Sequence, residues 1–130
     1  MKEINLHTVS TSALAYLGDA VLEMLVRERL VELGYSSSKT LNSHARAYVS
    51  APAQAVAMER ILPHLTETEH DFFRRGRNIG HTNTPKSATV AEYRSATGME
   101  VLFGYLHATG NAERSRELFA LAYGVPTETL

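Results

Sequence analysis

The segment from Leu14 to Leu30 constrains the fold most strongly, because its apolar residues repeat with the period of an α-helix and cover more than half of its circumference. Two adjacent apolar stripes make up this surface, the first formed by Leu14, Leu17, Val21 and Leu25 and the second by Ala15, Leu22, Val26 and Leu33. A helix that is apolar over so much of its surface must be enclosed by other elements. We therefore expect it to be a central helix of the protein.

Helix start and stop signals recur along the rest of the chain. Ser10, Thr11 or Ser12 can cap the first helix, and Gly34 can end it. Further helices are predicted over 39–48, between Ser50 and Pro63, between Thr66 and Gly76, between Thr89 and Gly110, and over 111–123. The segment 76–88 is rich in Gly, Asn, Thr and Pro and is predicted to be a loop. Because no segment alternates as a strand does, we predict an all-α helical bundle with one domain over residues 1–130.

Composition excludes several classes of site and partner. The chain has no cysteine, which removes disulfides, thiolate nucleophiles and Cys-ligated zinc, and its six histidines lack zinc-ligand spacing. No apolar run approaches the roughly 18 residues that a membrane span requires, and the first ten residues do not resemble a signal peptide. We expect a cytoplasmic protein without a membrane partner.

Gly18 and Asp19 interrupt the apolar helix side by side. Glycine within a helix costs about 1 kcal/mol relative to alanine, and an ionised carboxylate that borders a core requires a partner. Glu100 repeats this arrangement, since helical spacing gives it a face of mostly small residues that includes Gly104. Small residues allow another helix backbone, a cation or a phosphate to approach closely. We expect two half-buried carboxylates on separate helices, each beside a glycine.

Two explanations for these carboxylates remain open at this point. Asp19 and Glu100 could form ordinary salt bridges with Arg27, Arg29 or Arg94. Alternatively, a hard cation such as Mg²⁺ could lie between them, retaining several water ligands because only one or two carboxylates hold it.

A cluster of basic residues is concealed by the formal net charge of −1. Between positions 74 and 94 the chain has a single acid, Glu92, and five basic residues, namely Arg74, Arg75, Arg77, Lys86 and Arg94. Arginines on a loop of this composition are suited to contacts with phosphate and ribose. The alternative is a solvated loop after a helix C-terminus, whose dipole favours nearby arginines.

Two segments resemble the ribonuclease III family. "LAYLGDAVLE" is similar to the family's signature helix, E-x-x-E-F/Y-L-G-D, and "MEVLFGYL" is similar to its second acidic segment, D-x-x-E-A-L-x-G-A. Together with "RRGRNIGHTNTPK", they resemble the short bacterial branch of the family, mini-ribonuclease III, over Leu14 to Leu106. The resemblance implies the helical catalytic domain of that family without a double-stranded-RNA-binding domain.

The resemblance also implies roles for individual residues. Asp19 and Glu100 match the family's catalytic, Mg²⁺-binding carboxylates, and Tyr16 matches an aromatic residue that inserts into the partner of a homodimer. The implied RNA contacts are Arg75, Arg77, Asn78, Thr84 and Lys86. Three positions depart from the larger enzymes, which carry acids where this chain has Ser12, Ala15 and Thr97.

The expected function is therefore that of a Mg²⁺-dependent endoribonuclease. Its expected substrate is double-stranded RNA, in particular precursor of large-subunit (23S) ribosomal RNA, with a ribosomal protein or an assembly intermediate as a further partner. The missing acids keep one alternative open, a dimeric RNA-binding module without catalysis. A helical homodimer with only a structural role is a third hypothesis.

Overall fold

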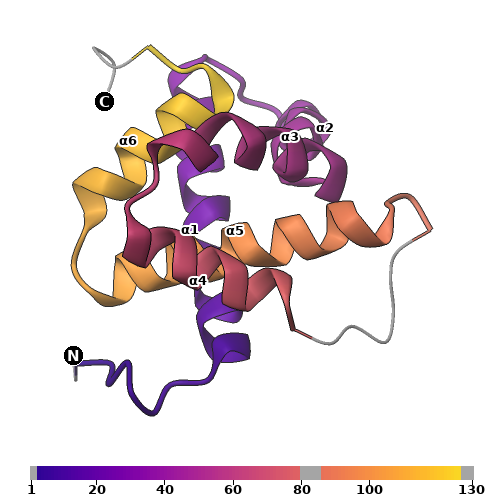
Figure 1. Cartoon of the computed structure of the whole chain (residues 1–130). Helices are drawn as coiled ribbons and strands as arrows, with labels where there is room; N and C mark the ends of the chain where they lie inside the picture. The colour runs from indigo at the N-terminus through magenta and orange to yellow at the C-terminus, as the bar shows by residue number, and fades with distance from the viewer. Residues whose placement is uncertain (1–2, 80–85, 127–130) are drawn as a thin grey trace.

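The computed structural model describes residues 3–79 and 86–126, and within them the chain is entirely helical (Figure 1). The elements are α1 (Thr11–Glu32), α2 (Ser38–Val49), α3 (Ala51–Ile61), the short 3₁₀-helix η1 (Leu62–His64), α4 (Glu67–Arg77), α5 (Val90–Ala108) and α6 (Ala112–Tyr123). The prediction of an all-α fold is confirmed. No helix in these two ranges is long and apolar enough to cross a membrane.

The helices pack around α5. Figure 1 shows that α1 crosses α5 and that α4 runs alongside α5. Nine residues of α5 are buried, against seven of the longer α1, so the central position is shared between these two helices. The main core contains Leu22 and Val26 from α1, Met58 and Ile61 from α3, Met99, Leu102 and Phe103 from α5, and Leu118 from α6. By contrast, α2 has no buried residue.

The predicted caps form in the structure. The side chains of Ser10, Ser37 and Ser50 accept hydrogen bonds from backbone N–H groups at the starts of α1, α2 and α3. Thr66 with Glu69 and Thr89 with Glu92 make complete capping boxes at α4 and α5. Gly34, Gly110 and Gly124 follow α1, α5 and α6 with positive φ, as expected for residues that end helices.

Gly76 does not end α4, contrary to the sequence-based prediction. The helix continues to Arg77 and is capped by Asn78. Gly76 is buried because α5 passes against it: a Cβ atom there would lie 2.7 Å from the Cα of Gly98. The glycine therefore serves close packing between α4 and α5 and not a turn.

A buried ion pair joins the start of α4 to α6. Glu69 is only 5% exposed, and its two carboxylate oxygens accept hydrogen bonds from Nε and Nη2 of Arg114, both at 2.9 Å. The same Nη2 donates to the carbonyl of His64 at 2.7 Å. The hydrogen bonds from Arg114 hold the pKa of Glu69 below its usual value. Arg114 therefore joins α6 to the end of η1 and the start of α4, which are 50 and 45 residues away in sequence.

Candidate active site

Among the glycines that the structure describes, the tightest contacts lie where α1 crosses α5. A Cβ atom on Gly18 would lie 1.6 Å from the backbone oxygen of Glu100, and one on Gly104 would lie 2.0 Å from the backbone oxygen of Leu14. No side chain fits at these distances. The sequence left open whether a helix backbone, a cation or a phosphate approaches Gly18. The structure shows that it is the backbone of α5.

This crossing brings the carboxyl groups of Asp19 and Glu100 together from separate helices. The pKa of Glu100 rises from 4.5 to about 8, first because the group is buried, and further because of the charge of Asp19 and a side-chain hydrogen bond with it. Glu100 is partly buried, whereas Asp19 is exposed. The expectation of two half-buried carboxylates is thus wrong for Asp19, which lies one residue beyond the Gly18 contact and is exposed.

No basic side chain in residues 3–79 and 86–126 forms an ion pair with either carboxylate. Arg27 is paired with Glu23 on its own helix at 3.0 Å. Arg29 and Arg94 form no ion pair with any described acid, and the Nε atom of Arg29 is buried without a hydrogen-bond partner. The salt-bridge explanation is not supported, and the two adjacent acids repel each other when both are ionised.

The donor set suits a hard divalent cation with few protein ligands. Asp19 and Glu100 offer carboxylate oxygens, which Mg²⁺ prefers. In the part of the chain that the structure describes, no group of three or more His, Asp or Glu side chains could hold a metal ion. Thr97, one of the three departures from the family pattern noted in the sequence, donates its hydroxyl hydrogen to the carbonyl of Tyr93 at 3.0 Å. Any Mg²⁺ held here would take its other ligands from water or substrate.

The C-terminal end of α4 presents two arginines on aromatic rings. The guanidinium carbon of Arg75 lies 4.6 Å from the ring centroid of Phe72, and that of Arg77 lies 5.6 Å from the centroid of Phe73. We call these residues the arginine pair; within the described residues neither forms an ion pair. The preceding Arg74 is different, because its Nη2 binds Asp71 at 2.7 Å.

The rings beneath the arginine pair were not recognised from the sequence. The signal lies in the spacing within "FFRRGR": Arg75 follows Phe72 by three positions, and Arg77 follows Phe73 by four. Residues at these spacings share a helix face. Of the other predicted RNA contacts, Asn78 caps α4 and Lys86 is exposed before α5. Thr84 lies outside the described residues.

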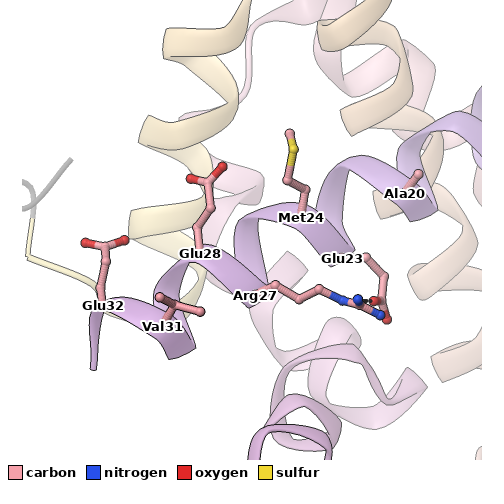
Figure 2. Close-up of a pocket in the computed structure, with 7 residues that line it drawn as sticks. All are labelled: Ala20, Glu23, Met24, Arg27, Glu28, Val31 and Glu32. Atoms are coloured by element: carbon pink, nitrogen blue, oxygen red, sulfur yellow. Dashed lines mark hydrogen bonds and ion pairs between the residues drawn. The ribbon is translucent and has the colours of Figure 1, made fainter. Parts of the chain in front are cut away.

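The outward face of α1 has an exposed apolar surface. Tyr16 is 85% exposed and Met24 is 51% exposed. Beyond Tyr16 lies a shallow groove of about 830 Å³ lined by Ala20, Glu23, Met24, Arg27, Glu28, Val31 and Glu32, which we call the α1 groove. Figure 2 shows its lining side chains, all from α1, with Arg27 and Glu23 turned toward each other. The α1 groove begins one residue after Asp19.

Comparisons with known proteins agree on one family. Residues 12–111 match the model of the "Ribonuclease III domain". The chain is 48% identical over 122 residues to mini-ribonuclease 3 of Symbiobacterium thermophilum, covering 94% of each chain. It is 47% identical over 108 residues to mini-ribonuclease 3 of Enterococcus faecalis, covering 82% of each. A crystal structure of a Fusobacterium nucleatum protein superimposes with a TM-score of 0.82 at 29% identity, covering 92% of this chain and 95% of that one.

Replacing Glu100 with Gln should stabilise the metal-free protein at pH 8. Because the pKa of Glu100 is raised from 4.5 to about 8 on folding, the folded chain holds a proton that the unfolded chain has lost, and stability falls as pH rises through that interval. Gln has no proton to lose. We expect a gain of about 1–3 kcal/mol in the free energy of unfolding at pH 8 and little change at pH 4.

Urea denaturation in EDTA at the two pH values measures this gain. The matched control is Glu113→Gln, because Glu113 is an exposed carboxylate on α6. An equal change at pH 4 and pH 8 would contradict a raised pKa for Glu100.

Proposed function

The chain belongs to the ribonuclease III family, and on this basis we propose that it hydrolyses phosphodiester bonds of double-stranded RNA with Asp19 and Glu100 as its catalytic, metal-binding carboxylates. Membership of the family makes it an endoribonuclease. The observation that supports the assignment of the site is the α1–α5 crossing, which holds two carboxylates together without a cationic side chain among the described residues. Such a pair needs a cation to be stable in its ionised form.

Mg²⁺ is the cation that we propose for this pair. When bound, it would supply positive charge that lowers the pKa of water and stabilises the leaving oxygen of the phosphodiester. Glu100, held by the buried side of α5, would contribute a ligand of fixed position, and the exposed Asp19 would contribute one that water and substrate can reach. With so few carboxylates, binding of the metal before RNA should be weak.

Double-stranded RNA is the substrate that the arginine pair fits. A-form RNA is contacted mainly through phosphates and 2′-hydroxyl groups, and arginine offers several N–H donors in one plane to a phosphate. The rings of Phe72 and Phe73 support the two guanidinium groups, so less conformational entropy is lost on binding. Asn78, Thr84 and Lys86 extend the proposed contact along the following loop.

A homodimer would place two such sites on one duplex. Tyr16 and the α1 groove form an exposed apolar surface on α1, and a two-fold axis at this surface would make each copy contribute the same patch. Because the α1 groove begins next to Asp19, the two sites would lie close to the interface. Two-fold symmetry suits the two strands of a duplex.

The natural substrate that we propose is precursor of the large-subunit (23S) ribosomal RNA, cut in the cytoplasm. The support for this is the likeness to the short branch of the family, which the curated relatives share. A ribosomal protein or an assembly intermediate would present the duplex. The relatives are named as ribonucleases, which favours the enzyme over an RNA-binding module without catalysis.

Asp19→Asn and Glu100→Gln should each lower the rate of duplex RNA cleavage by at least about 100-fold, because each removes a charged ligand of the metal. Cleavage of a labelled duplex is measured with Mg²⁺ and with EDTA, and wild-type activity should be lost in EDTA. Glu113→Gln, on α6, is the control. Wild-type rates in both site variants would refute the assignment of the site, and absence of cleavage by the wild type would refute the proposed activity.

Arg75→Ala and Arg77→Ala should each weaken duplex binding by about 5- to 50-fold and reduce the slope of log K against log salt by about 1. Binding is measured by fluorescence anisotropy at several salt concentrations. Arg74→Ala is a close control, because this arginine is neighbouring but already paired with Asp71. If Arg74→Ala weakens binding as much as the other two, the arginine pair has no special role.

Met24→Glu should dissociate the homodimer, because it places a charge in the apolar part of the α1 groove. Val56→Glu is the matched control: Val56 is also 51% exposed but lies on α3. Sedimentation equilibrium measures the mass of each variant. A dimer that persists in Met24→Glu, or one that is lost in Val56→Glu, would exclude the α1 face as the interface.

A further inference from the structure

Helix α5 contacts a neighbouring backbone at two points, one on either side of Glu100. Gly104 is the contact with α1, described above. Gly98 is the contact with α4: a Cβ atom there would lie 2.6 Å from the ring of Phe73 and 2.7 Å from its backbone oxygen. A Cβ atom on the facing Gly76 would lie 2.9 Å from the backbone oxygen of Thr97. The contact of Gly76 with Gly98 is therefore close, but it differs from the crossing at the carboxylates, because side chains of Phe73 and Val101 lie beside the two glycines.

The Gly76–Gly98 contact is linked to the arginine pair by sequence and by the ring of Phe73. Gly76 is the residue between Arg75 and Arg77. The ring of Phe73 occupies the space that a side chain at position 98 would need, and the same ring lies under the guanidinium of Arg77. The distance between α4 and α5 at this contact thus determines where Arg77 lies relative to α5. On α5 the contact is at Gly98, two residues before Glu100.

We propose that the Gly76–Gly98 contact positions the arginine pair relative to the carboxylates, so that an RNA phosphate held by the arginines lies at Asp19 and Glu100. This inference rests on the proposed function. Gly76 and Gly98 are positioning residues: they touch neither metal nor RNA and act through α4. Reaction rates depend steeply on such placement, because a misplacement of about 1 Å can cost roughly 100-fold.

The proposal separates rate from affinity. In Gly98→Ala, α4 must shift away from α5 to admit the methyl group. The arginines still bind RNA, but the phosphate no longer meets the carboxylates. We expect kcat per folded molecule to fall at least about 10-fold, while the duplex Kd changes less than about threefold.

Three measurements test this separation. Single-turnover cleavage gives the rate. Fluorescence anisotropy gives the duplex Kd, with Glu100→Gln added to both proteins so that the duplex stays intact. The rise in Tm on adding Mg²⁺ should equal that of the wild type, because the Gly18–Gly104 crossing is unchanged. Leu118→Val, a buried α6 variant, controls for lost stability and should retain both rate and affinity per folded molecule.

Val101→Ala keeps the test decisive if Gly98→Ala does not fold. It removes the methyl groups beside Gly76, which loosens the same contact without adding atoms or removing a ring under the arginine pair, and we expect the same loss of rate at smaller magnitude. Unchanged kcat per folded molecule in whichever variant folds would overturn the proposal, as would a loss confined to Tm or to Kd. If Arg75→Ala and Arg77→Ala weaken binding but the contact variant does not slow cleavage, only this inference fails. If the wild type neither binds nor cuts duplex RNA, the proposed function itself fails.

Discussion

The backbone contact between α1 and α5 determines the rest of the site. Gly18 and Gly104 each cost about 1 kcal/mol in helix propensity, and in return the two helices approach without intervening side chains. The approach places Asp19 and Glu100 within electrostatic reach, and burial raises the pKa of Glu100. The same backbone contact therefore brings the two acids together and makes them repel each other when both are ionised. Ionisation of Glu100 in the folded chain thus costs free energy at the place where a cation would bind.

The acids and the arginines of the proposed site lie on different helices. The acids of the site lie on α1 and α5, whereas the arginine pair lies on α4, supported by Phe72 and Phe73. Because α4 runs alongside α5 (Figure 1), anionic and cationic surfaces belong to neighbouring helices. A net charge near zero therefore conceals the local charge on which binding of a metal and of a polyanion depends.

Local signals predicted the fold well, and contacts between helices were harder to predict. Caps such as Ser10 and the Thr66 capping box involve residues close in sequence, so their hydrogen bonds follow from spacing alone. The pairing of Asp19 with Glu100 came from periodicity and the family resemblance together. The exposure of Asp19 and the burial of Gly76 were not predicted, because each depends on where a second helix crosses, which no periodicity specifies. The assignment of Thr84 stays a prediction.

The ion pair of Glu69 with Arg114 joins α6 to the rest of the fold. The match to the family model ends at residue 111, one residue before α6 begins. Yet α6 supplies the arginine that neutralises a carboxylate buried at the start of α4. Without α6, Glu69 would be a buried charge without its partner, at one end of the helix whose other end carries the arginine pair. The family model thus ends just before a helix whose arginine pairs with a carboxylate inside the matched region.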